Sequence, residues 1–309
     1  MPSAIAVSGL RKSFGDKVVL DGIDFDVPEG TTFALLGPNG SGKTTTVQIL
    51  STLIGSDGGR ASIAGHDLAT APQAVRGAIG VTGQFSAVDN LLTAEENLIL
   101  MADLHHLPRG EGRRRTAELL DRFDLVDAAK RLASTCSGGM RRRLDLAMTL
   151  IGRPRVIFLD EPTTGLDPRS RRLMWHTVRE LVAGGVTIFL TTQQLDEADE
   201  LADRIAVLNG GKLVATGTPD ELKRGLPGGH VRLLFHDKSD LNRAAQALQN
   251  AKPDEETLAL RVPSDGGVRA LRDLLDRLDK TGIENASLEV HTPDLEDVFH
   301  KLTEKEAAR

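Results

Sequence analysis

The stretch Gly37–Thr44, GPNGSGKT, decides the fold of this chain. It follows an apolar run, 32–36, that is typical of a buried strand, and it opens a segment with helical periodicity, 45–54. Gly37, Gly40 and Gly42 let the backbone adopt conformations closed to other residues, so consecutive N–H groups can point inward. The N-terminus of the following helix adds partial positive charge. This stretch is therefore predicted to cradle a polyphosphate.

Two side chains of the stretch add the chemistry of a nucleoside triphosphate site. Lys43 is expected to reach the β- and γ-phosphates as a point charge, and the Thr44 hydroxyl to complete the coordination of a Mg²⁺. Glycine is common in this chain, 31 of 309 residues, so chance matches must be considered. With Gly at about 0.1, Lys at roughly 0.05 and Ser/Thr at roughly 0.12 per site, about 0.02 chance matches are expected in this chain.

Composition limits the classes of protein to consider. Hydrophobic residues at 40% and charged residues at 27% are ordinary for a globular protein, and the net charge of −6 argues against nucleic acid as a partner. The arginine cluster 113–115, with Arg109 upstream, is best interpreted as a solvated helix face. The single cysteine, Cys136, excludes an internal disulfide and fits a reducing compartment. Neither a signal peptide nor a membrane span is predicted, which favours the cytosol.

A second motif, Arg155–Glu161 (RVIFLDE), is an apolar strand that ends in two acids. In open α/β sheets ligands bind at this edge, so Asp160 is placed to hold the Mg²⁺ shell and Glu161 to polarise an attacking water. Two acids buried without partners would be costly, which disfavours a purely structural reading. Asp167 is a natural N-cap ahead of Pro168, and this capping role is compatible with a functional one.

Three further candidates are weaker when each is taken alone. Ser137-Gly138-Gly139 starts a helix and presents N–H groups to an anion, although many helices begin with Ser and Gly. Gln84 follows the strand-like 79–82 and could touch a metal or water, although an isolated glutamine is more often a surface residue. Phe14 could stack on a planar base, and a place in the core is equally compatible with composition.

The periodicities predict an α/β chain with a second, smaller domain. Strands are expected at 18–20, 23–27, 32–36, 61–64, 156–159, 186–190, 204–208 and 212–216, with Asp21-Gly22 as a hairpin signal and 209–211 as a turn. Helices at 137–152, 168–183 and 194–201 alternate with the later strands, which implies a mostly parallel sheet covered on both faces. A Leu-rich helical insertion is expected from residue 94, giving a helical subdomain at 94–152.

The best linker in the chain is 225–229, GLPGG. It predicts an N-terminal domain, 1–225, and a small C-terminal α+β domain, 226–309. The expected order there is strand 231–235, helix 239–250, strand 257–262, helix 267–280, strand 286–291 and helix 293–302.

The motifs, in order, resemble those of the ATP-binding subunits of ABC transporters. They are GPNGSGKT, Gln84, CSGGM (136–140), FLDEPTTGLD (158–167) and TTQQLDEAD (191–199). The resemblance covers residues 5–225, and it is specific because five elements agree in order and spacing. Within the family the chain is most similar to the ATPases of drug exporters of the daunorubicin-resistance type, through its tail segment 292–299. The resemblance implies a P-loop NTPase core with an antiparallel β subdomain.

The resemblance also implies roles for residues of this chain. Glu161 is expected as general base, Gln84 and Gln193 as catalytic sensors, and Thr44, Gln84 and Asp160 around Mg²⁺. The residues expected to bind ATP are Phe14, Gly37, Pro38, Asn39, Gly40, Ser41, Gly42, Lys43, Thr44, Thr45, Ser137, Gly138, Gly139 and Asp167. Ser137 and Gly139 would contact the γ-phosphate held by a second subunit. Implied partners are a separate transmembrane permease and a second copy or a related ATPase, with the chain peripheral on the inner face of the cell membrane.

This sequence departs from the family pattern in two places. Cys136 and Met140 stand where Leu and Gln are usual, changes that keep the Ser-Gly-Gly backbone chemistry. Gln193 stands where a switch histidine is expected, and an amide cannot take up a proton near neutral pH, so slow turnover is predicted. An ATP-sensing regulatory module with negligible turnover therefore remains an alternative to an export ATPase. An ABC-type ATPase acting on DNA or ribosomes would need coiled-coil insertions or a second cassette, and the sequence has neither.

Overall fold

The computed structural model describes residues 2–83, 87–224, 229–248, 250–264, 267–280, 282–283, 287–291 and 294–299. The chain divides into two compact units, unit 1 (1–219) and unit 2 (220–309). The boundary predicted at 225/226 lies in GLPGG, most of which falls outside the described residues. Each unit has its own sheets and its own core.

Unit 1 begins with an antiparallel sheet in the order β2-β1-β4-β5. Its strands are β1 (Ser3–Phe14), β2 (Lys17–Pro28), β4 (Gly58–Ile63) and β5 (His66–Asp67). The sequence did not predict β1, and the hairpin prediction at Asp21-Gly22 is wrong. The chain runs through these residues as one strand, with Gly22 at φ +75° where the register shifts, so this glycine forms a bulge. The hairpin turn lies earlier, at Gly15-Asp16, between β1 and β2.

The second sheet of unit 1 has the order β10-β9-β3-β8-β7-β6. Its strands are β3 (Thr32–Leu36), β6 (Ile79–Thr82), β7 (Val156–Asp160), β8 (Thr187–Thr192), β9 (Arg204–Asn209) and β10 (Lys212–Gly217). All neighbours are parallel except β9 and β10, which are antiparallel and joined by the predicted turn 209–211. This confirms the mostly parallel sheet, and β3, β7 and β8 are continuously buried, as strands covered on both faces must be.

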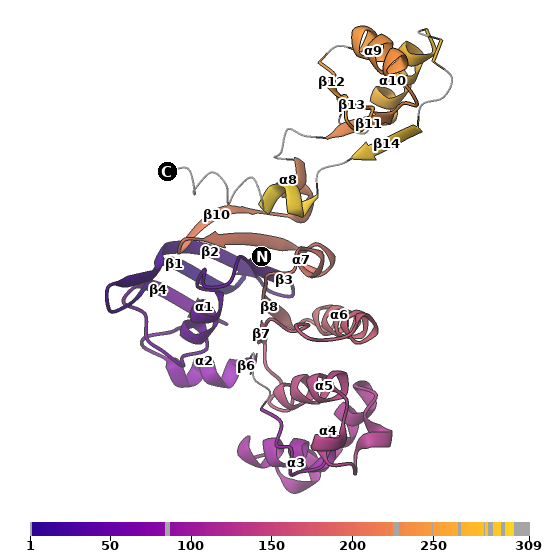
Figure 1. The fold of residues 1–309 in the computed structure, drawn as a ribbon. Coiled ribbons are helices and arrows are strands. Elements are labelled where there is room, and N and C mark those ends of the chain that lie inside the picture. Colours follow the sequence, from indigo (N-terminus) through magenta and orange to yellow (C-terminus); the bar gives the residue numbers. More distant parts are fainter. Residues whose placement is uncertain are drawn as a thin grey trace. The chain divides into compact units, whose positions relative to one another are not determined.

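Helices cover both faces of this sheet (Figure 1). On one side lie α1 (Lys43–Leu50) and α2 (Pro72–Ala78), and on the other α6 (Pro168–Ala183) and α7 (Leu195–Leu201). The core between the two sheets contains stacked aromatic rings, with the centroids of Phe25 and Phe33 5.2 Å apart and those of Phe33 and Phe189 5.5 Å apart. The glycine loop, residues 37–44, therefore joins the buried strand β3 to helix α1, and both pack in this core.

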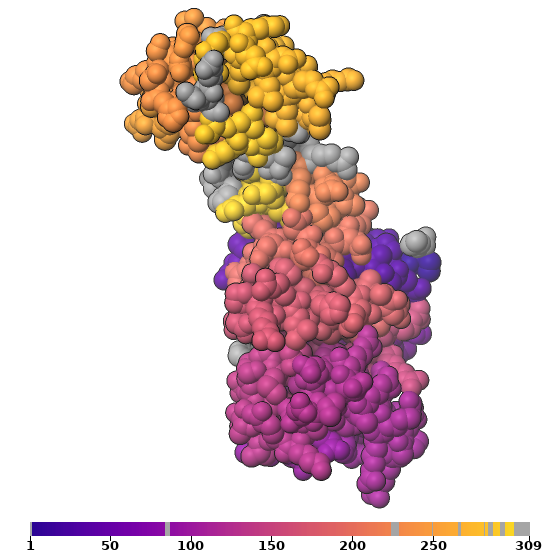
Figure 2. Space-filling model, turned by 90° about the vertical axis from the view of Figure 1, so that its right-hand side faces the viewer, coloured from indigo at the N-terminus to yellow at the C-terminus, as the bar shows by residue number. Residues whose placement is uncertain are grey.

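The predicted helical insertion contains α3 (Ala94–Leu104), α4 (Arg109–Arg122) and α5 (Gly138–Thr149), with short 3-10 turns at Val126–Ala128 and Ala133–Thr135. A capping box formed by Thr93 and Glu96 starts α3. The interpretation of 113–115 as a solvated face is wrong for Arg115, which is largely buried and donates to the carbonyl of Leu150 at 3.0 Å. In Figure 2 the insertion, coloured purple to magenta, gathers at one end of unit 1 beside the rose-coloured atoms of the segments that follow it.

Unit 2 has the strand order β12-β13-β11-β14 with antiparallel neighbours. After α8 (Pro219–Arg224), which spans the unit boundary, its elements are β11 (His230–Leu234), α9 (Lys238–Ala247), β12 (Lys252–Asp254), β13 (Ala259–Pro263), α10 (Val268–Asp279) and β14 (Ser287–His291). The order β-α-β-β-α-β is the ferredoxin-like split βαβ arrangement. It is α+β as predicted, although β12 was missed. Residues 295–299 are helical, and Thr292 and Pro293 of the tail motif lie outside the described residues.

Within the described residues, the structure contains no helix with the length and apolar character that crossing a bilayer requires.

Candidate functional site

The glycine loop requires glycine for two different reasons. Gly40 and Gly42 have φ angles of +79° and +112°, in the region that side chains disfavour. Gly37 has no such angle, which corrects its predicted conformational role. A Cβ on Gly37 would lie 2.3 Å from the carbonyl oxygen of Leu208, so close approach of the backbone is what excludes a side chain there.

Lys43, at the first turn of α1, is a buried cation in this loop. Its Nζ donates to the carbonyls of Gly37 at 2.8 Å and Pro38 at 3.0 Å, and it lies 3.8 Å from a carboxylate oxygen of Glu161. Burial lowers the pKa of Lys43, and the charges of Glu161 and Asp160 oppose that shift. A cation held this way, next to a helix N-terminus, is suited to phosphate.

An open cleft of about 390 Å³ lies over the loop. It brings together residues from β1, β2, the glycine loop, α1 and the end of β7, namely Phe14, Lys17, Val19, Asn39, Gly40, Gly42, Lys43, Thr44, Thr45 and Glu161. Phe14 is 52% exposed, so it is not a core residue, and Lys12 lies 5.3 Å from the centre of its ring. The exposed ring leaves an aromatic face near the phosphate loop, where a planar base can stack. Pro38 and Ser41 belong to the loop but do not line the cleft.

The acids of β7 meet the glycine loop where that strand ends. Asp160 accepts hydrogen bonds from the hydroxyls of Thr44, at 3.3 Å, and Thr191, the latter short. Hard oxygen donors of this kind suit Mg²⁺, which keeps several waters and needs only one or two protein carboxylates. Among the described residues no group of three or more His, Cys, Asp or Glu side chains is placed to hold a metal ion.

Glu161 is the middle residue of the acid loop, residues 160–162, and has a backbone φ of +49°. Its carboxylate faces the cleft, 10% exposed, and accepts a hydrogen bond from the Thr164 hydroxyl at 3.2 Å. A residue other than glycine in the left-handed region stores of order 1–3 kcal/mol of strain, and such strain concentrates at functional sites.

The Ser-Gly-Gly motif lies apart from this cleft. The Ser137 hydroxyl accepts from the N–H of Met140 at 3.2 Å and so caps α5, as predicted. Ser137, Gly138 and Gly139 are not among the residues that line the cleft over the glycine loop. Asp167 caps α6, also as predicted, and hydrogen bonds from Ser170 hold its pKa below the usual range. One chain therefore presents an exposed serine cap that its own phosphate cleft does not use.

Only one of the two predicted glutamine sensors lies among the described residues. Gln84 lies outside the described residues. Gln193 is exposed directly after β8, two residues beyond the Thr191 that holds Asp160, but it does not line the cleft.

Sequence reasoning missed Glu197 of α7, which is 1% exposed. It accepts from the Thr163 hydroxyl at 2.8 Å and from the indole N–H of Trp175 at 3.4 Å. Burial raises the pKa of this carboxyl, against the hydrogen bonds from Thr192, Thr163 and Trp175, which lower it. Its place on the apolar face of α7, beside Ala198 and Leu201, is the signal that could have revealed it.

This raised pKa makes the contribution of Glu197 to stability depend on pH. The folded state holds the proton more tightly than the unfolded chain, so its stabilising effect is full below the unfolded pKa of about 4.5 and is lost as pH rises through the folded pKa. Glu197→Gln has no ionisable group at this position, so this pH-dependent contribution to stability is absent. We expect the free energy of unfolding, parent minus variant, to be larger at pH 4.5 than at pH 8 in urea titrations. Glu180→Gln, at an exposed site, is the control, and a flat difference would contradict the argument.

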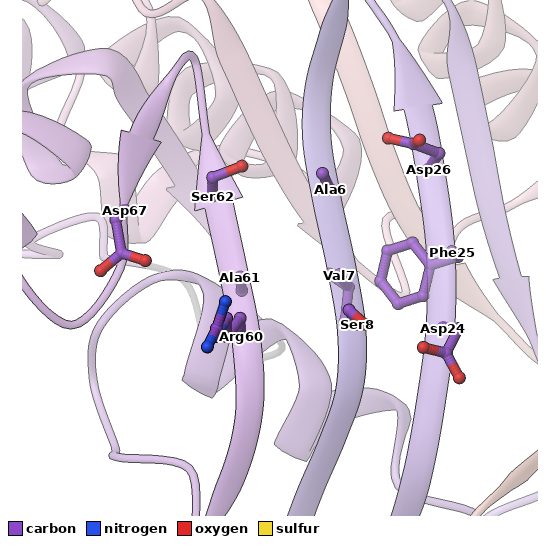
Figure 3. Close-up of a pocket in the computed structure, with 10 residues that line it drawn as sticks. All are labelled: Ala6, Val7, Ser8, Asp24, Phe25, Asp26, Arg60, Ala61, Ser62 and Asp67. Carbon is purple, nitrogen blue, oxygen red and sulfur yellow. The ribbon is translucent and has the colours of Figure 1, made fainter.

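A larger hollow, about 590 Å³, lies on the antiparallel sheet (Figure 3). Its lining comes from β1, β2, β4 and β5 and includes Arg60, Asp24, Asp26 and Asp67. Asp24 accepts from the N–H of Gly9, and Asp67 from Ala69 and Thr70, so these carboxylates have local structural partners. The smaller cleft over the glycine loop is the better candidate for a ligand, because buried charge, strained backbone and a helix N-terminus converge there.

Comparison with known proteins identifies what this arrangement resembles. The family model described as ABC transporter matches residues 20–164. A daunorubicin resistance ATP-binding protein of Streptomyces coeruleorubidus is 46% identical, over 97% of this chain and 95% of its own length. A doxorubicin resistance ATP-binding protein of Mycobacterium tuberculosis is 44% identical, over 97% of this chain and 93% of its own length. A solved structure of the ATP binding subunit of an ABC transporter covers 72% of this chain and 93% of its own, at 30% identity and a TM-score of 0.65.

Proposed function

This chain belongs to the ABC transporter family, as the ATP-hydrolysing subunit of an exporter, and we propose that it drives efflux of a drug, antibiotic or lipid-like compound through a separate permease. ATP binding closes two copies head to tail, and hydrolysis reopens them. The drug alternative is carried over from relatives named for daunorubicin and doxorubicin resistance.

The observation that carries this proposal is the separation of the serine cap from the phosphate cleft. Ser137 caps α5 and is exposed together with Gly138, whereas the cleft is lined by the glycine loop, α1, β1, β2 and Glu161. Because neither part is complete alone, a second copy in the opposite orientation supplies the missing half of each site. The Ser137 cap and Gly139 then bind the γ-phosphate held by the partner, and Gly138 and Asp167 stand at the same interface.

Within each site the residues of this chain divide the work. The amides of residues 37–45 and the Lys43 ammonium hold the phosphates, and the Phe14 ring stacks on the adenine. Thr44 and Asp160 hold Mg²⁺, which when bound neutralises charge on the phosphate oxygens. The Glu161 carboxylate takes a proton from a water molecule. As it does so, the water oxygen forms a bond to the γ-phosphorus and the bond from that phosphorus to the bridging oxygen breaks, which releases ADP and phosphate. Gln84 and Gln193 are assigned to sensing the γ-phosphate, with Gln193 slowing turnover because it cannot be protonated.

The proposed partners follow from this scheme. A transmembrane permease provides the substrate path, and the chain is placed on the inner face of the cell membrane through it. Unit 2, as a separate compact unit, is assigned to regulating turnover or to supporting dimer formation.

Transport measurements test the proposal. The full chain is reconstituted in proteoliposomes with the membrane protein that copurifies with it, with its ATP cleft facing outward, and daunorubicin is the fluorescent probe. We expect ATP-dependent accumulation of the probe inside the vesicles and hydrolysis that increases when the permease is present. Absence of accumulation together with negligible hydrolysis would favour the ATP-sensing regulator instead.

A further inference from the structure

The guanidinium of Arg142, in α5, joins that helix to two other parts of unit 1. Its side chain is 12% exposed. It donates to the carbonyl of Pro162 through Nε at 2.9 Å, of Gly83 through Nη1 at 2.9 Å, and of Asp160 through Nη2 at 3.3 Å. The same Nη2 lies 3.5 Å from the carbonyl oxygen of Glu161. One side chain of α5 therefore contacts every carbonyl of the acid loop.

These contacts hold the acid loop, whose backbone is strained at Glu161. Glu161 has φ +49°, and a β-carbon makes that conformation unfavourable. On its amide side the N–H of Glu161 donates to Thr191, at 3.1 Å to the carbonyl and 3.2 Å to the hydroxyl. On its carbonyl side Arg142 is the donor. Such strain persists only where the surroundings over-determine the conformation, and Thr191 and Arg142 restrain it from opposite ends.

Arginine is suited to this task because its five N–H groups form a rigid fork, whereas a lysine offers a single flexible point charge. Its charge is balanced by Asp145, three residues along α5, at 3.5 Å. Burial lowers the pKa of Arg142, and the charges of Asp145, Asp160 and Glu197 oppose that shift. An arginine guanidinium stays protonated in proteins.

We propose that Arg142 is the positioning residue that fixes the direction of the Glu161 carboxylate toward the cleft. This rests on the proposed role of Glu161 as general base. Without the fork the acid loop relaxes toward an ordinary φ, and the carboxylate leaves the position from which it reaches water. Misplacement of a catalytic group by about 1 Å can cost on the order of 10²-fold in rate, without affecting the phosphate contacts that set ATP affinity.

The test compares Arg142→Ala, Arg142→Lys and Arg143→Ala in the full chain. Arg143 is the matched control, since it lies on the same helix but donates to the carbonyl of Asp124 outside the site. We expect Arg142→Ala to lower kcat by roughly 10²-fold while the equilibrium affinity for ATP stays within about 2-fold, and Arg142→Lys to recover part of the loss. Arg143→Ala should hydrolyse ATP at the parent rate. If Arg142→Ala proves unstable, the kcat and ATP affinity of Arg142→Lys, at an unchanged melting temperature, are compared with those of the parent and of Arg143→Ala instead.

A double-mutant cycle with Glu161→Gln separates positioning from general packing. If Arg142 acts through Glu161, then Arg142→Ala causes no further loss of single-turnover rate once Glu161 is Gln. Losses that multiply independently, or an Arg142→Ala rate equal to that of Arg143→Ala, overturn the inference and leave the proposed function intact. A parent-like rate in Glu161→Gln alone overturns the base assignment itself.

Discussion

Glu161→Gln is expected to lower the rate of ATP hydrolysis by about 10²–10⁴-fold, the range that a general base contributes. The amide keeps the shape of the side chain and can still accept from the Thr164 hydroxyl, but it cannot take a proton from water. ATP binding should be retained, because Glu161 lies beside the phosphate cradle without forming it. Since reopening follows hydrolysis, the variant should accumulate as an ATP-bound dimer.

Steady-state phosphate release and size-exclusion chromatography with and without ATP measure both outcomes. Glu118→Gln, at an exposed position of α4, controls for the loss of a surface carboxylate. Hydrolysis by Glu161→Gln at the rate of the parent chain would show that another group is the base.

Lys43→Ala is expected to weaken ATP binding strongly. Hydrogen bonds to a charged group contribute about 1.5–3 kcal/mol, which corresponds to roughly 10–150-fold in the dissociation constant. The variant also leaves Glu161 without the cation 3.8 Å away, so an uncompensated carboxylate then faces the triphosphate. The loss should therefore lie at the upper end of that range.

Isothermal titration of the full chain with Mg²⁺-ATP measures this affinity. Lys212→Ala is the matched control, because Lys212 is 61% exposed and pairs with Asp21. Unchanged affinity in Lys43→Ala, with intact folding by circular dichroism, would contradict the assignment of the glycine loop.

The parts of the fold set by local signals could be predicted from the sequence. Helix α6 has the predicted bounds, 168–183, because Asp167 caps it and Pro168 occupies its first turn. The apolar runs predict the buried strands β3 and β7, and residue spacing predicts the glycine loop and the acids at the end of β7.

The features that were missed depend on contacts distant in sequence. Asp21-Gly22 has the composition of a hairpin turn, but pairing of β2 with β1 along its whole length turns the glycine into a bulge. Arg142 lies in a run of three arginines, 141–143. Nothing in that run indicates that the guanidinium of Arg142 donates to carbonyls 18 to 59 residues away in sequence. The periodicity of α7 places Glu197 on the apolar face, but its hydrogen-bond partners Trp175 and Thr163 are known only from the fold.

In unit 2 the first and last strands are neighbours, with His230 of β11 opposite His291 of β14. The polypeptide thus leaves this sheet beside the point where it enters, so the two ends of the sheet segment are adjacent. Among the described residues the strands of this sheet pair only with one another. A module with adjoining ends can be excised, exchanged with that of a relative or extended by a fusion without opening any ladder of the ATPase core.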